Sequence, residues 1–71
     1  MNKETFLKVL KEIKDKYGND VGLQTVYDVF RRMGYHDKDI KYWLKKLDGI
    51  YFVVKDWRVY FDENFDKLIS I

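Results

Sequence analysis

The chain has 71 residues, of which 46% are hydrophobic and 18% aromatic, which argues against disorder and predicts one small domain over residues 1–71. The formal net charge of +2 does not by itself point to nucleic acid, and the absence of Cys excludes disulfide bonds and thiolate metal sites. No apolar run approaches the ~20 residues of a membrane span, and the start MNKETFLKVLKEI is amphipathic rather than signal-like, so we expect a cytoplasmic protein with no membrane partner.

Residues 3–17 carry the first predicted helix. The apolar side chains recur at the spacing of one helical face: Phe6, Val9, Leu10, Ile13 and Tyr17. Asn2 is placed to cap the start of this helix, and Gly18 is placed to end it.

Residues 21–33 carry the second predicted helix. Its apolar face has the same spacing: Leu23, Val26, Tyr27, Phe30 and Met33. Asp20 is the expected N-cap, and Gly34 is the expected stop.

Residues 37–47 carry the third predicted helix, DKDIKYWLKKL. The residues expected to face the core are again spaced as one stripe: Ile40, Trp43, Leu44 and Leu47. Either His36 or Asp37 provides the N-cap, and Gly49 ends the segment.

The apolar pattern changes after residue 49. Residues 50–54 and 57–61 are β-branched and aromatic and predict a β-hairpin, with Lys55 and Asp56 between the strands. The tail predicts a short helix that begins at Asp62, and a C-terminal strand is the alternative. Three apolar residues of this helix are expected to face inward: Phe65, Leu68 and Ile69.

The order of the predicted elements resembles a winged helix-turn-helix domain. The resemblance covers roughly residues 4–61 and rests on Met33-Gly34-Tyr35-His36, then Ile40, Leu44 and Leu47, then Gly49-Ile50-Tyr51, then Val59-Tyr60-Phe61. The pattern is similar to small archaeal or viral winged-helix DNA-binding proteins and to the C-terminal winged-helix module of archaeal replicative helicases. It implies an α+β fold with three helices, a two-stranded hairpin wing and a short C-terminal helix. Residues 37–47 correspond to the recognition helix and residues 54–58 to the wing.

Positive charge is concentrated in the middle of the chain. Residues 31–58 hold eight basic and four acidic side chains, a net charge of +4. Four residues form a stripe on the outer face of the third helix: Lys38, Lys41, Tyr42 and Lys45. Such side chains neutralise or hydrogen-bond phosphates, so the stripe predicts contact with DNA, and a solvated charged face is the alternative. The stripe lacks the Arg, Asn and Gln that read bases best, and Asp37 and Asp39 would repel phosphates.

Further DNA-binding candidates flank the stripe: Lys46, Arg31, Arg32, Lys55, Trp57 and Arg58. Arg31 and Arg32 end the second helix, where they either reach the DNA backbone or only complement the helix dipole. Arg58 is placed at the wing, where a guanidinium enters a minor groove or clamps a phosphate. Trp57 is interpreted either as a lid on the core or as a stacking platform for a base, whereas Trp43 is expected in the core.

The sequence does not indicate an enzyme. His36 is the single histidine, and no second His or Cys completes a metal site with it. No Gly-rich phosphate loop is present, and no Ser has a base partner in view. We therefore expect no catalytic residue, no cofactor, no metal and no small-molecule ligand.

Two functions remain open at this level. The first is a winged-helix protein that binds double-stranded DNA as a homodimer and regulates transcription, reading the major groove with residues 37–47. The first helix and the tail residues Phe65, Leu68 and Ile69 are candidate dimer surfaces. The alternative is a protein-interaction module of a replication or transcription complex, favoured by the low net charge, the short wing and the missing base-reading side chains.

Overall fold

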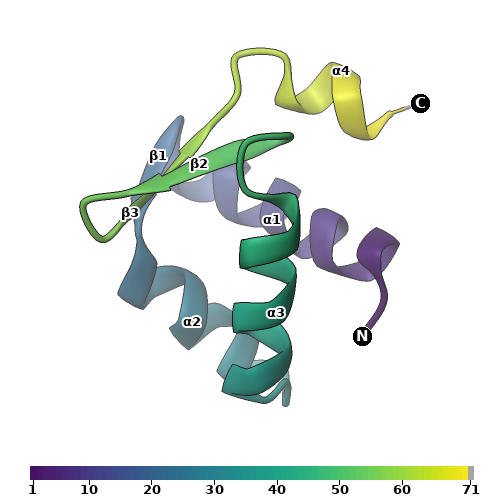
Figure 1. Cartoon of the computed structure of the whole chain (residues 1–71), viewed down its shortest axis with the longest axis vertical. Helices are drawn as coiled ribbons and strands as arrows, with labels where there is room; N and C mark the ends of the chain where they lie inside the picture. Colours follow the sequence, from purple (N-terminus) through teal and green to yellow (C-terminus); the bar gives the residue numbers. More distant parts are fainter. Residues whose placement is uncertain (71) are drawn as a thin grey trace.

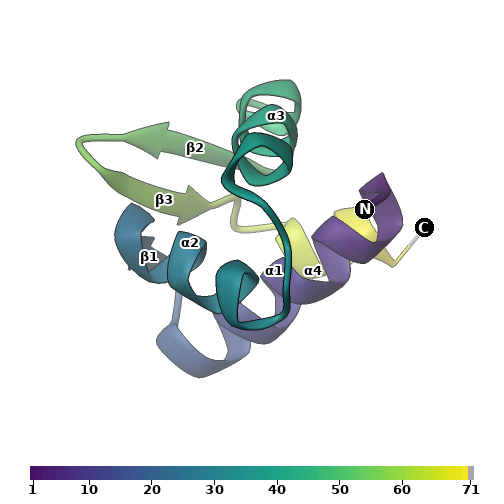
Figure 2. The same ribbon diagram turned by 90° about the horizontal axis from the view of Figure 1, so that it is seen from below.

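The computed structural model describes residues 1–70, which form an α+β fold with four helices and one three-stranded antiparallel sheet (Figure 1). The elements follow one another as α1 (Lys3–Tyr17), β1 (Asp20–Gly22), α2 (Leu23–Arg32), α3 (Asp37–Leu47), β2 (Phe52–Lys55), β3 (Arg58–Phe61) and α4 (Phe65–Ile69). The β2–β3 hairpin projects to one side of the molecule, α3 stands beside it, and α4 lies near α1 on the other side (Figure 2). The predicted helices and hairpin are all present, together with one strand that the sequence did not predict.

α1 begins and ends where its capping residues predict. The Asn2 side-chain oxygen accepts a hydrogen bond from the Thr5 N–H at 2.8 Å, and the Gly18 N–H donates to the Lys14 carbonyl oxygen at 2.8 Å. Gly18 has a φ of 97°. This conformation favours glycine, so the chain turns there toward β1.

β1 occupies the place expected for the start of the second helix. It pairs antiparallel with β3, which becomes the central strand of the order β1-β3-β2. Val21 lies opposite Val59, and the two side chains are only 3% and 0% exposed. This short strand therefore adds buried apolar surface to the sheet as well as backbone hydrogen bonds.

α2 begins at Leu23, and the prediction that Asp20 caps it was wrong. Gly22 holds the N-cap position and has no side chain to offer. The Leu23 N–H donates instead to the Trp57 carbonyl oxygen at 2.8 Å. The backbone of the hairpin turn thus supplies the acceptor that a capping side chain would otherwise supply.

The turn between β2 and β3 consists of Asp56 and Trp57, one residue later than predicted. Lys55 pairs with Arg58 across the turn, so the loop has two residues. Their φ angles are 52° and 62°, and a type I′ hairpin turn requires positive φ at both central residues. The side chains alternate along each strand, and those of the inner face are buried: Phe52, Val59 and Phe61.

Aromatic rings at the centre of the molecule join the three long helices. Phe6 of α1 stacks on Phe30 of α2 with 4.9 Å between ring centroids, and Trp43 of α3 lies 6.3 Å from Phe6. Phe6 and Phe30 are fully buried, and Trp43 is half-buried against them, in agreement with its predicted place in the core. Tyr17 and Met33 were predicted on buried faces but are exposed, because they lie at or just beyond the last residue of their helices.

α4 packs against α1, and the alternative of a C-terminal strand is excluded. Its N-cap is Asn64 rather than Asp62, whose side chain accepts a hydrogen bond from the Asn64 N–H at 2.8 Å. Asp66 lies 3.5 Å from both Lys11 and Lys14 of α1. Of the three residues predicted to face inward, the first is fully buried and the other two are half-buried: Phe65, Leu68 and Ile69.

We expect Phe30→Ala to lower the free energy of unfolding by about 3–5 kcal/mol, because it leaves a cavity in the ring cluster. Urea denaturation followed by circular dichroism measures this loss. Met33→Ala, at the C-cap position of the same helix, is the matched control. Since Met33 is 48% exposed, its replacement should change stability by no more than about 0.5 kcal/mol. Equal losses from the two substitutions would contradict the placement of the core.

Candidate nucleic-acid interface

Arg31 connects the end of α2 with the start of α3. Its guanidinium donates two hydrogen bonds to the Asp37 carboxylate, at 2.7 and 2.8 Å, and a third to Asp28 at 3.2 Å. The hydrogen bonds from Arg31 hold the pKa of the Asp37 carboxyl below its ordinary value, and those from Asp37 raise the pKa of the guanidinium. Arg31 and Asp37 therefore offset each other's charge, and the phosphate repulsion expected from Asp37 is reduced.

Three lysines of α3 border one groove between α3, α2 and the Asp56–Trp57 turn, which we call the α2–α3 groove. It consists of two adjoining hollows of about 420 and 500 Å³. Four residues line both hollows: Leu23, Tyr27, Lys41 and Trp57. Lys38 borders only the hollow near the start of α3, and Lys45 borders only the other one. All three lysines are exposed, and none forms an ion pair within residues 1–70.

Tyr42 and Lys46 lie away from this groove. The Lys46 ammonium donates to the Tyr42 hydroxyl at 3.1 Å and sits 5.4 and 5.5 Å from the centroids of the Tyr42 and Trp43 rings. Tyr42 is 52% exposed and meets Trp43 edge to face. The predicted stripe is therefore divided: the lysines at 38, 41 and 45 border the groove, and Tyr42 belongs to a neighbouring surface.

Trp57 stands at the tip of the hairpin with 83% of its surface exposed, so the interpretation as a core lid was wrong. In the predicted register it would have paired with Val54 on the inner face, but the actual turn ends the strand at Lys55. A left-handed conformation costs a residue with a side chain roughly 1–2 kcal/mol. A bulky ring at such a position, with little packing to compensate, suggests a functional role.

The remaining basic candidates are not gathered with the lysines. Arg58 donates to the Asp20 carboxylate through Nε at 3.1 Å and also through Nη2, so it links β3 to β1. Lys55 lines a hollow on the outer face of the hairpin together with Val53 and Tyr60. Arg32 is exposed at the end of α2. The sequence alone suggested a guanidinium extended from the wing, whereas the structure shows Arg58 engaged within the sheet.

Tyr27 is a groove residue that sequence reasoning assigned to the core. It is half-buried, and the Arg31 guanidinium lies 5.4 Å from the centroid of its ring. Burial raises the pKa of its hydroxyl, and the charge of Asp37 adds to this effect. Two features of the sequence could have indicated that Tyr27 is not a core residue: it lies at the edge of the apolar face of the helix, and Arg31 follows it one turn later.

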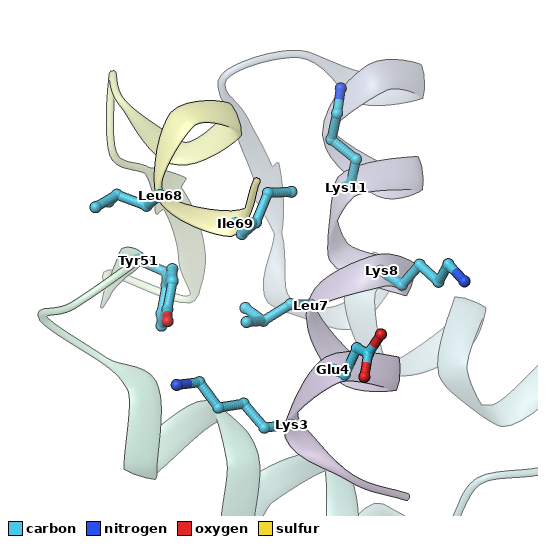
Figure 3. Close-up of a pocket in the computed structure, with 8 residues that line it drawn as sticks. All are labelled: Lys3, Glu4, Leu7, Lys8, Lys11, Tyr51, Leu68 and Ile69. Atoms are coloured by element: carbon cyan, nitrogen blue, oxygen red, sulfur yellow. The ribbon is translucent and has the colours of Figure 1, made fainter. Parts of the chain in front are cut away.

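A further hollow, of about 530 Å³, lies between α1, α4 and Tyr51 (Figure 3). Of its four charged lining residues, Lys11 pairs with Asp15 at 2.6 Å, and Lys3, Glu4 and Lys8 form no ion pair within residues 1–70. The Lys3 ammonium lies 5.4 Å from the centroid of the Tyr51 ring. Figure 3 also shows Lys8 pointing away from Tyr51. Because Glu4 also lines this hollow and Lys8 points away from its Tyr51 side, the hollow is less suited than the α2–α3 groove to bind a polyanion.

Residues 1–70 contain no group of His, Cys, Asp and Glu side chains able to hold a metal ion. His36 is exposed at the N-cap position of α3, as predicted, but its side chain makes no capping hydrogen bond. None of the helices described is long and apolar enough to cross a membrane.

No protein-family model, no curated protein and no solved structure matches this chain at a significant level.

Replacing Arg31 with Met should raise the pKa of the Asp37 carboxyl toward its ordinary value of 3.8. A carboxyl whose pKa is lowered by folding stabilises the fold above its unfolded-state pKa, and this contribution is lost as the pH falls through the lowered pKa. The stability difference between wild type and Arg31→Met should therefore be present at neutral pH and disappear in acid. An NMR titration of the Asp37 side chain measures the shift. Arg32→Met is the control and should leave the titration unchanged, whereas an unchanged pKa in Arg31→Met would contradict the contact.

Trp57→Gly should stabilise the fold by about 0.5–1 kcal/mol, because relief of the left-handed strain exceeds the entropic cost of glycine. Thermal denaturation followed by circular dichroism should show a rise of a few degrees. Trp57→Ala retains the Cβ atom and is the control, with little change expected. Destabilisation by both substitutions would show that the ring supports the fold.

Proposed function

We propose that this chain is a winged helix-turn-helix protein that binds duplex DNA through α3 and the β2–β3 hairpin, and that it serves in transcription regulation. The order of elements and the antiparallel sheet are compatible with such a fold. The joint between α2 and α3 comprises only residues 33–36, which supports a helix-turn-helix. In this proposal α3 is the recognition helix and the hairpin is the wing.

The observation that carries the proposal is the row formed by Lys38, Lys41 and Lys45. These lysines are exposed and form no ion pair within the described residues, whereas Arg31 and Arg58 are held by carboxylates. Unpaired ammonium groups along one helix can replace the counterions of successive phosphates. Release of those counterions drives association and makes the affinity depend on salt.

The same side chains support weak discrimination between DNA sequences. α3 contains no Arg, Asn or Gln, the residues that recognise base edges with two hydrogen bonds. Gln24 lines the α2–α3 groove, but its side-chain amide donates to Asp28 at 3.1 Å. We therefore expect dissociation constants in the non-specific range of about 10⁻⁴–10⁻⁶ M at physiological salt.

One observation favours protein binding as a second candidate function. Three apolar side chains are exposed on the outer surface of the hairpin and in the segment that leads into β2: Ile50 at 57%, Val53 at 48% and Tyr60 at 39%. Val53 and Tyr60 lie opposite each other on the two strands, and contiguous exposed apolar side chains mark docking sites. Failure of the chain to bind any DNA at low salt, together with loss of a partner on Val53→Asp, would favour this second function.

Lys41→Glu combined with Lys45→Glu should weaken binding to duplex DNA at least about tenfold, because attraction to two phosphates becomes repulsion. Fluorescence anisotropy with a labelled duplex at low salt measures the change. Lys8→Glu combined with Lys16→Glu is the control, since it makes the same change of net charge with two exposed residues of α1. Equal weakening by both pairs would show that only the overall charge matters.

The neutral pair Lys41→Gln and Lys45→Gln tests the contacts without introducing repulsion. Each lost phosphate contact lowers the slope of log affinity against log salt by about 0.9. The slope should therefore decrease by about 2 in this variant. An unchanged slope would place the phosphate contacts on another surface.

A further inference from the structure

We propose that Trp57 is a base-stacking site and that the chain prefers DNA containing unpaired bases to fully paired duplex. This inference rests on the proposed function, because it assumes that DNA binds in the α2–α3 groove. It adds the class of DNA substrate and the residue that selects it.

The first step is that the indole ring contributes little packing to the fold. Trp57 is 83% exposed, more than any other large hydrophobic side chain among the described residues. Its φ of 62° is one that an L-residue rarely adopts. The ring is therefore held in solvent at a position where glycine suits the backbone better.

The second step is that the backbone beneath the ring is fixed. The Trp57 carbonyl oxygen accepts the Leu23 N–H at 2.8 Å, and the next residue, Arg58, pairs with Lys55 on one side and with Gly22 on the other. These contacts hold the turn against both neighbouring strands and the start of α2. Because the backbone of the turn is already fixed, a partner that covers the ring restricts only its two side-chain torsions.

The third step concerns the charge around the ring. Trp57 and Lys41 line each of the two hollows of the groove. Lys38 lines the first hollow, and Lys45 lines the second. Two carboxylates also line the groove, but both are engaged within the fold: Asp37 accepts from Arg31, and Asp48 accepts from the Val54 N–H at 3.0 Å. The acidic neighbour Asp56 lines the hollow on the outer face of the hairpin instead. A partner suited to this groove has a flat apolar face next to negative charge, which is the chemistry of a nucleotide.

The fourth step distinguishes the forms of DNA. In a paired duplex each internal base is stacked between its neighbours, so the grooves offer base edges but no free base face. An unpaired base can turn its face to an aromatic side chain, and such stacking tolerates any base. Trp57 therefore gains a contact only where pairing is interrupted, while the lysines bind phosphates in either form.

The test compares one duplex sequence in two forms, fully paired and with a central loop of unpaired thymines, by anisotropy at low salt. Wild type should bind the looped DNA about tenfold to a hundredfold more tightly. Trp57→Ala should weaken binding to looped DNA about tenfold or more and binding to paired DNA much less, so that the preference is lost, whereas Trp57→Phe should retain most of it. Thermal denaturation of each variant confirms that it is folded.

Fluorescence gives a second readout. The chain has two Trp residues, so Trp43→Phe leaves Trp57 as the single reporter. Looped DNA should quench this emission, and paired DNA should quench it much less. Equal affinity of wild type for the two DNAs, or an equal loss on both in Trp57→Ala, would overturn the stacking site.

The Lys41→Gln and Lys45→Gln pair separates failure of this inference from failure of the proposed function. If this pair weakens binding to both DNAs while Trp57→Ala changes neither, DNA binding stands and the stacking site is wrong. If wild type binds neither DNA at low salt, the proposed function is wrong as well.

Discussion

The pairing of β1 with β3 fixes the hairpin turn against the start of α2, and the α2–α3 groove depends on that contact. A two-stranded hairpin alone is marginally stable in water, so its tip would have no fixed position. Here Val21 and Val59 bury each other across the strand pair, and the Leu23 N–H donates to the Trp57 carbonyl oxygen at 2.8 Å. The same three-residue strand thus completes the sheet, orients the first turn of α2 and brings Trp57 to the groove that Lys41 also lines.

The arginines and the lysines of α3 have different surroundings in the folded chain. Two of the three arginines join elements of the fold: Arg31 binds Asp37 across the α2–α3 joint, and Arg58 binds Asp20 across the sheet. The guanidinium fork suits such directed contacts with carboxylates. The lysines of α3 are compact, hydrated charges on flexible stems, and they stay exposed. The outward charge of α3 is therefore of the kind that attracts phosphates without fixing a base sequence.

The parts of the structure that follow local rules could be predicted from the sequence. The helical periods placed Phe6, Phe30 and Ile40 in the core, and the period of α3 alone placed its lysines outside. β1 could not be predicted, because three residues are too few to show an alternating pattern. The turn could not be placed either, since the Asn-Gly or Asp-Gly that usually marks it is absent.

The surroundings of the hairpin residues depend on contacts between distant parts of the chain. Arg58 is engaged by Asp20, which lies 38 residues earlier, and no local pattern signals that pairing. The position of Trp57 depended on a shift of the turn by one residue. With Lys55 and Asp56 in the turn, the ring would have packed inward opposite Val54. With Asp56 and Trp57 in the turn, it is exposed.

The Asp56–Trp57 turn departs from the local preference for glycine, and the exposed indole ring brings no evident gain inside the molecule. Natural chains usually agree with local rules, and exceptions that no internal contact compensates concentrate at functional sites. An exposed indole and a row of ammonium groups recognise different properties of a ligand, one a flat face and the other negative charge. Charge attraction acts on any polyanion, whereas stacking requires an accessible ring. In the proposed mode of binding, these two kinds of group come from different elements, α3 and the hairpin turn, so affinity and selectivity would change independently of each other.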